Sequence, residues 1–142
     1  MILPVTRHNY PTFLSLWEEF TQDQPEPKLA MTVTRQLLAG IMDYPDTGVA
    51  LLDGDRAGLL WVQASETPWD PARRAIGWGT YVRPTYRRTG IAKALWEVAS
   101  RDLKTKGFQC VILSPLARDL HVINALYGAG FRPYQVTLKK DL

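Results

Sequence analysis

Cysteine and histidine are scarce in this sequence, which limits the chemistry that the chain can carry. The 142 residues include one cysteine, Cys110, and two histidines, His8 and His121. A disulfide needs two cysteines and a zinc cage needs about four ligands, so we expect neither a disulfide nor a metal within one chain. Cys110 stands in an apolar run with no histidine near it in sequence, which favours a small buried side chain over a nucleophile.

Long apolar runs are also missing. No window approaches the roughly 18 to 20 apolar residues that a membrane span needs. Residues 1–12 lack a basic segment followed by a long apolar core, as a secretory leader would have. With 46% apolar and 22% charged residues, the chain is composed for one globular domain with a single core. We therefore expect residues 1–142 to form one soluble, cytoplasmic domain without a membrane partner.

The net charge of +3 is small, but it is unevenly distributed. Residues 1–46 carry six acidic and three basic residues, whereas residues 47–142 carry eight acidic and fourteen basic residues. A basic face can bind nucleic acid, although a solvated face is the more frequent explanation of a modest excess. Because the sequence has no aromatic and basic repeat and no zinc-finger spacing, the pattern argues against a nucleic-acid partner.

The spacing of the apolar residues predicts an α/β fold of layered α+β type, in which helices cover a mixed sheet. The predicted elements are a strand at 2–5, helices at 9–20 and 32–44, a hairpin over 47–65, a polar loop at 66–74, a strand at 75–82, a helix from 91 to about 106, a strand at 108–115, a helix ending near 130, and a strand at 133–140. No internal repeat or interdomain linker interrupts this order.

Three local details accompany these elements. Asn9 is expected to cap the first helix, and Gly77 and Gly79 would let another backbone or a ligand approach the strand at 75–82. The inner face of the second helix is expected to consist of Val33, Leu37, Leu38 and Ile41.

The stretch from Val82 to Ser100 carries the most specific signal in the chain. A strand running into Arg-Arg-Thr-Gly and then a helix brings backbone N–H groups and a helix N-terminus to one point, which attracts phosphate. Gly90 would let the main chain approach the anion, and Arg87 and Arg88 offer forked donors. A solvated helix entrance is the alternative. No G-x-x-x-x-G-K-[ST] or G-x-G-x-x-G motif is present, so ATP and dinucleotide sites are unsupported.

This stretch resembles the central motif of the GNAT superfamily, the Gcn5-related N-acetyltransferases, which is approximately V-x-P-x-x-R-x-x-G-x-[GA]. The chain matches it without a gap at Val82, Pro84, Arg87, Gly90 and Ala92. The predicted order of elements is also that of the family, and Gly130 with Phe131 resembles the end of its last helix. The resemblance implies a mixed, mostly antiparallel sheet of about six to seven strands flanked by about four helices.

The resemblance also implies acetyl-CoA as co-substrate. The family's loop would wrap the coenzyme pyrophosphate, chiefly through main-chain N–H groups. A backbone N–H near Tyr81 or Val82 would face the thioester oxygen as an oxyanion donor, where that strand splays from the one at 111–114. The implied coenzyme-binding residues are Tyr81, Val82, Arg87, Arg88, Thr89, Gly90, Ile91 and Ala92.

Acid and base residues are less well defined. Many family members use a carboxylate on the central strands and a tyrosine on the last helix, but the strand at 75–82 has no Asp or Glu. Glu66 and Asp70 in the loop before that strand, and Asp119 at the start of the last helix, are candidate general bases. The ordinary alternatives are solvated charges for the first two and a helix cap for Asp119. A water chain could serve as the base equally well. Tyr127 is the candidate acid, but without a gap the usual position falls on Leu126, and one residue turns a helical side chain by roughly 100°.

The resemblance places the acceptor beside the first two helices and the loop between the middle strands. Acidic and aromatic residues there suit a cation, so a primary amine is the expected acceptor, either a small cationic compound or a peptide or protein amine. The candidate acceptor-binding residues are Trp17, Glu18, Tyr44 and Trp69.

A second hypothesis is a module that binds acetyl-CoA or nucleic acid without turnover. It would follow if Trp17, Tyr44, Trp69 and Trp78 filled the acceptor cavity. An exposed edge at the last strand would also allow a homodimer.

Overall fold

The computed structural model describes residues 1–22, 31–67, 70–115 and 120–142. These residues divide into two compact units, Met1–Ile112 and Leu113–Leu142, and each is described by itself. The expectation of one domain over the whole chain stays a prediction.

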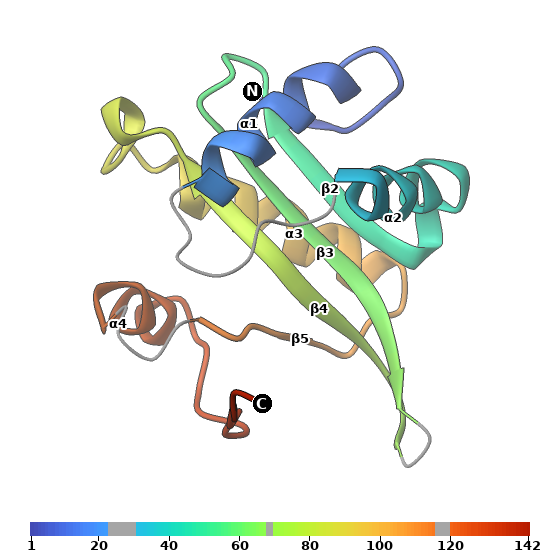
Figure 1. Cartoon of the computed structure of the whole chain (residues 1–142), viewed down its shortest axis with the longest axis vertical. Coiled ribbons are helices and arrows are strands. Elements are labelled where there is room, and N and C mark those ends of the chain that lie inside the picture. Colours follow the sequence, from blue (N-terminus) through green and yellow to red (C-terminus); the bar gives the residue numbers. More distant parts are fainter. Residues whose placement is uncertain (23–30, 68–69, 116–119) are drawn as a thin grey trace. The chain divides into compact units, whose positions relative to one another are not determined.

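The first unit is built on a mixed five-stranded sheet in which every strand lies beside its neighbour in the sequence (Figure 1). The first four strands pair antiparallel, and the fifth joins the fourth in parallel. The strands are β1 (Ile2–Pro4), β2 (Gly48–Asp53), β3 (Gly58–Thr67), β4 (Asp70–Val82) and β5 (Cys110–Ile112).

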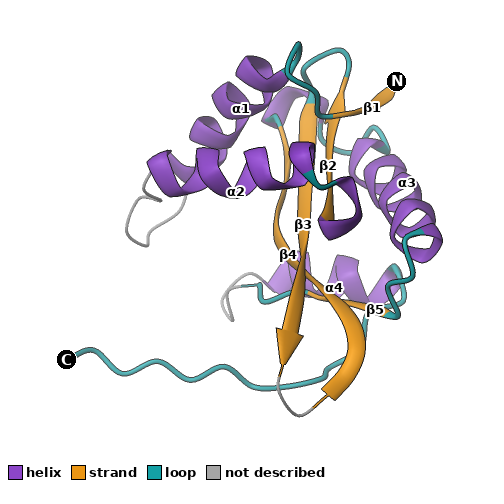
Figure 2. Ribbon diagram, turned by 90° about the vertical axis from the view of Figure 1, so that its right-hand side faces the viewer, coloured by secondary structure: helices purple, strands orange, loops and turns teal. Residues whose placement is uncertain are grey.

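Helices cover both faces of this sheet (Figure 2). Helices α1 (Tyr10–Gln22) and α2 (Met31–Asp43) lie on one face, and α3 (Ile91–Thr105) lies on the other. The second unit contains α4 (Leu120–Gly128). Among the described residues, the α/β fold class and the four α-helices agree with the prediction, whereas the sheet has fewer strands than the six to seven expected.

Alternation along β2 and β3 divides the buried residues into two clusters, because successive strand side chains point to opposite faces. The cluster on the α1 and α2 face consists of Phe13, Leu14, Leu16, Trp17, Leu38, Ile41, Ala50, Leu52, Leu59, Trp61 and Tyr81. The cluster on the α3 face consists of Val49, Leu51, Leu60, Val62, Ala75, Leu95, Ala99, Leu103 and Phe108.

Helix α3 confirms the sequence prediction most closely. Leu95, Ala99 and Leu103 recur every four residues and are buried, which anchors one side of the helix on the sheet. Glycines with positive φ stand at both ends, Gly90 at +86° and Gly107 at +85°. The left-handed conformation at Gly107 ends the helix, and its N–H donates to the Lys104 carbonyl.

Two predictions about the first helices are wrong. Asn9 does not cap α1 with its side chain: its Oδ1 accepts a hydrogen bond from the Thr6 N–H at 2.7 Å, and its Nδ2 donates to the Pro4 carbonyl. Val33 is 51% exposed, and Thr34 is buried in its place. Thr34 shares a helical face with Leu38, which lies four residues later. A prediction based only on hydrophobicity chose Val33 instead, and so placed the start of the buried face one residue too early.

The predicted polar loop at 66–74 is also wrong, because β4 already begins at Asp70 and pairs with β3 from there. Pro71 lacks an N–H and would be a poor residue in a regular ladder. It lies where the register shifts between Ser65 and Thr67, and such an irregularity tolerates a proline. Residues 68–69 lie outside the described part of the chain.

Cys110 is exposed, contrary to expectation. It begins the short strand β5, in which Val111 packs against the α3 face cluster. Alternation directs Cys110 to the opposite face of the sheet.

The C-terminal unit forms no strand at 133–140, so the last predicted strand is wrong for the described residues. Val136 and Leu138 are 84% and 89% exposed. Their alternation fixes which side chains would share a face, but a strand also needs a neighbouring edge to pair with.

Candidate functional site

The centre of the site is an irregularity in β4. Trp61 pairs with Gly79 and Val62 with Gly77, so Trp78 is the extra residue of a β-bulge. A bulge bends its strand and redirects a side chain. Gly79 is required beside it, because a Cβ there would lie 2.7 Å from Cε1 of Phe20 and 3.1 Å from Cη2 of Trp17. Helix α1 therefore packs directly on the backbone of β4.

Strand β5 accompanies β4 for only a short distance. The parallel pairing joins Arg74–Ile76 to Cys110–Ile112 and ends alongside Ile76. Beyond that point β4 passes through the bulge and continues to Val82. The two strands are therefore paired before the bulge only, as the expected splay between them requires.

The loop after β4 presents backbone N–H groups at the start of α3. A short 3-10 helix, Pro84–Tyr86, leads into it, and the Thr89 hydroxyl donates to the Tyr86 carbonyl. Arg88 has φ +64°, a strained value for a residue with a side chain. Gly90 is the N-cap at φ +86°, and no described side chain caps α3. The N–H groups of the first helical turn are thus without side-chain acceptors, as at a phosphate site.

There is room for an anion at this corner. A Cβ placed on Gly90 would meet nothing within 4 Å. The side chains of Arg87 and Arg88 are exposed, and Arg87 Nε donates to the Val82 carbonyl at 3.0 Å. That bond folds Arg87 back over the end of β4. The main chain and Arg88 are therefore the more accessible donors.

A charged pair that sequence analysis missed lies just before the loop. Arg83 donates from Nε and Nη2 to the two carboxylate oxygens of Glu19, at 2.9 and 2.6 Å. The Tyr81 hydroxyl donates to the same carboxylate at 3.5 Å. Hydrogen bonding from Arg83 holds the pKa of Glu19 below its usual value and raises the pKa of Arg83. The pair joins α1 to the end of β4.

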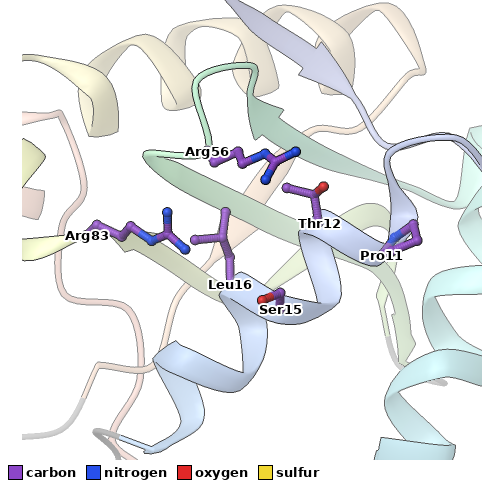
Figure 3. A pocket seen from close by; sticks show the side chains of 6 residues that line it. All are labelled: Pro11, Thr12, Ser15, Leu16, Arg56 and Arg83. Atoms are coloured by element: carbon purple, nitrogen blue, oxygen red, sulfur yellow. The ribbon is translucent and has the colours of Figure 1, made fainter.

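A shallow cavity of about 220 Å³ lies between α1 and the ends of the strands. Figure 3 shows the side chains of Arg56, from the turn after β2, and Arg83 reaching toward α1. Arg83 is already engaged by Glu19, which leaves Arg56 as the other cation lining the cavity. The cavity is lined by Pro11, Thr12, Ser15, Leu16, Arg56 and Arg83.

The candidate acceptor residues differ in their placement. Trp17 is 2% exposed and packs on Gly79, so it supports the wall of the site from within the core. Glu18 is exposed on α1, and Tyr44 is 69% exposed after α2. Trp69 lies outside the described residues.

The candidate acid and base residues are less well placed. Glu66 belongs to β3, but its side chain lies outside the description, as does the whole of Asp119. Tyr127 is on α4 in the C-terminal unit and is 50% exposed, whereas Leu126 is half-buried. Leu126, on which the family's usual tyrosine position falls, is thus less exposed within that unit than the neighbouring Tyr127.

The described residues provide neither a metal-binding cluster nor a membrane-spanning helix. No group of three or more His, Cys, Asp or Glu side chains there could hold a metal ion. None of the described helices is long and apolar enough to cross a membrane.

A mixed sheet whose parallel edge strand pairs only before the bulge lies next to a glycine-containing loop at a helix N-terminus, which is the arrangement that the resemblance to acetyltransferases implies. The model of the Acetyltransferase (GNAT) family matches residues 11–131. The chain therefore belongs to the GNAT acetyltransferase family. No curated protein sequence matches it significantly.

Solved structures share the fold over their whole length. The aminoglycoside 6'-N-acetyltransferase AAC(6')-IG from Acinetobacter haemolyticus is 18% identical with a TM-score of 0.73, and the match covers 100% of this chain and 99% of that one. AAC(6')-Iy, in complex with the bisubstrate analogue CoA-S-monomethyl-acetylneamine, is 15% identical with a TM-score of 0.77, covering 100% and 97%. A putative acetyltransferase from Agrobacterium tumefaciens is 12% identical with a TM-score of 0.77, covering 100% and 99%.

Proposed function

We propose that this protein is an N-acetyltransferase that transfers the acetyl group of acetyl-CoA to a primary amine by direct attack in a ternary complex. Membership of the GNAT family supports the reaction class. The observation that carries the proposal is the loop before α3, with left-handed Arg88 and Gly90, an uncapped helix N-terminus and open space at Gly90. A cytoplasmic location accompanies this proposal.

These residues fit the coenzyme. The main chain of residues 87–92 would hold the pyrophosphate, with Arg88 adding a charge-assisted hydrogen bond. Ile91 and Ala92 contribute first-turn N–H groups, and Thr89 braces the loop through Tyr86. When bound, acetyl-CoA supplies a thioester carbonyl carbon as the electrophile.

Groups of the protein would stabilise the negative charge and transfer the protons. An N–H of Tyr81 or Val82 would stabilise the negative charge that develops on the carbonyl oxygen. As the amine nitrogen forms its bond to carbon, the carbon–sulfur bond breaks, the nitrogen loses a proton and the sulfur leaves as a thiolate or thiol. Glu66, Asp119 or water would take the proton, and Tyr127 would supply one to sulfur.

The acceptor side supports an amine. Glu18 and Tyr44 are exposed on or beside the first two helices, and together with Trp69 and the wall formed by Trp17 they would surround a cation. A structural neighbour carries an aminoglycoside-derived bisubstrate analogue, which also supports an amine acceptor.

Thermal unfolding tests the coenzyme half of the proposal, because a ligand that binds only the native state raises the midpoint. Acetyl-CoA should raise it, whereas ATP and NAD should not. Gly90→Ala should weaken that shift, since the added Cβ stands where the anion approaches. Gly107→Ala is the matched control: it has the same positive φ and open space but lies at the other end of α3.

Both glycine variants should lose about 1–2 kcal/mol of stability, because an L-residue is strained at positive φ. Equal acetyl-CoA shifts in the two variants would contradict the assignment of the loop. A shift in the wild type without release of CoA thiol for any amine would instead favour the non-catalytic binding module.

A further inference from the structure

One arginine at the end of the sheet has a strained backbone and no partner for its side chain. Arg56 closes the turn between β2 and β3, where its N–H donates to the Asp53 carbonyl at 2.8 Å. Its φ of +61° is a conformation that glycine adopts at lower cost. The exposed guanidinium makes no hydrogen bond or ion pair within the described part of the chain. The strain therefore points to a role in binding rather than in packing.

Arg56 lines the cavity of about 220 Å³ beside α1, together with two hydroxyl side chains of that helix. Figure 3 shows Thr12 pointing toward the Arg56 guanidinium, and Ser15 lies one turn further along. Neither hydroxyl bonds to a described residue. Asp55, next to Arg56 in the turn, is not among the lining residues. The volume is below the roughly 300 Å³ at which typical ligand pockets begin, so the cavity suits one small chemical group.

Arg83 brings a second guanidinium to the same cavity. Its N–H donates to the carbonyl of Ala57, the residue after Arg56, at 2.8 Å. Glu19 occupies Nε and Nη2 of Arg83, so the Nη1 N–H₂ group is left to donate. Glu19 also offsets one of the two positive charges. One positive charge stays uncompensated, and the first turn of α1 adds the positive end of the helix dipole.

We propose that this cavity is an anion site, separate from the coenzyme loop, that binds the carboxylate or phosphate group of a small molecule. The fork of Arg56 donates to two oxygens of that group, and Nη1 of Arg83 with the hydroxyls of Thr12 and Ser15 completes the set of donors. The bound anion joins the β2–β3 turn to α1. The site does not depend on the proposed acetyl transfer.

NMR titration of the ¹⁵N-labelled protein tests the site residue by residue. Inorganic phosphate and acetate are added separately at constant ionic strength, so that general screening does not change. CoA is present throughout to occupy the loop before α3. The amide signals of Thr12, Ser15 and Arg56 should shift and saturate with at least one of the two anions, and the tighter of the two identifies the group that the site prefers.

Substitutions of Arg56 separate binding from folding. Arg56→Gly should weaken anion binding by at least about tenfold, because a charge-assisted hydrogen bond is lost. Its thermal midpoint should stay close to that of the wild type, since glycine relieves the strain but frees the unfolded chain. Arg56→Lys keeps the charge without the fork and should bind with intermediate affinity. Arg101→Gln is the matched control: it removes an exposed arginine from α3 and should leave the affinity unchanged.

Three results would overturn the anion site. The first is a wild-type protein in which neither phosphate nor acetate shifts the three amide signals. The second is an Arg56→Gly variant that binds the anion as tightly as the wild type. The third is binding that occurs without CoA and is lost when CoA is added, because the cavity would then belong to the coenzyme site.

Discussion

The two faces of the sheet are built from different kinds of side chain. The α3 face is closed by aliphatic residues such as Leu51, Leu60 and Val62, all at most 1% exposed. The α1 and α2 face is aromatic: Trp17 stacks on Phe13 and meets Trp61 edge-on, with ring centroids 5.0 Å apart for the two tryptophans.

The two faces also differ in their polar groups. Nε1 of Trp17 and of Trp61 are buried without a hydrogen-bond partner among the described residues. The same face carries the Glu19–Arg83 pair and Trp78. Both faces bury large side chains, but only the aromatic face holds buried indole N–H groups that are unpaired among the described residues, and each such group costs some stability.

Truncation on the aliphatic face should have the largest effect on stability. Leu51→Ala removes a side chain that is 1% exposed on β2. It should lower the free energy of unfolding by about 2–5 kcal/mol, through lost burial and the cavity that remains. Urea denaturation measures the loss. The rise in the thermal midpoint caused by acetyl-CoA should persist. A Leu51→Ala protein that folds but whose midpoint no longer rises with acetyl-CoA would contradict the separation of the two faces.

Overpacking on the aromatic face should have a smaller effect. Gly79→Ala places a Cβ 2.7 Å from Cε1 of Phe20. It should cost about 1–3 kcal/mol, because α1 must shift away from β4. Phe20→Ala in the same background should recover part of that loss, as a double-mutant cycle would reveal. A Gly79→Ala variant as stable as the wild type would mean that α1 does not rest on β4.

Loss of the charge in the Glu19–Arg83 pair should have the smallest effect on stability, and the size of that effect should depend on pH. Glu19→Gln keeps a hydrogen-bond acceptor for Arg83 but removes the charge. Because the Glu19 side chain is 37% exposed, the wild-type advantage near neutral pH should be below about 1 kcal/mol.

The sign of that dependence follows from the lowered pKa of Glu19. The advantage is complete above the unfolded value of about 4.3 and disappears as the pH falls through the lower folded value. Urea denaturation of both proteins between neutral and acid pH measures it. An advantage that grows toward acid pH would show that Glu19 is not stabilised by Arg83.

Features set by contiguous residues could be predicted from the sequence. The stretch from Val82 to Ser100 contains the end of β4, the loop and most of α3, and each follows from a local pattern of glycine and helical spacing. The hairpin over 47–65 was predicted for the same reason, and β2 and β3 confirm it.

Features that join distant residues could not be predicted. Glu19 and Arg83 are 64 residues apart, and nothing in either stretch indicates the other. The bulge at Trp78 depends on the register of β3 against β4, which glycines alone do not fix. The start of β4 at Asp70 was missed because two prolines outweighed the pairing that surrounds them.

The sequential order of the strands has a consequence for how the chain folds. The strands β2, β3 and β4 pair through short connections, so their ladders close with little loss of loop entropy. By contrast, the whole of α1 and α2 separates β1 from β2 in the sequence, so that Ile2 must pair with the distant Asp53. Contacts between residues close in the sequence, such as those that join β2, β3 and β4, form early. The meander that carries the bulge is thus expected to assemble first, and α1 then docks onto a strand that already has its bend.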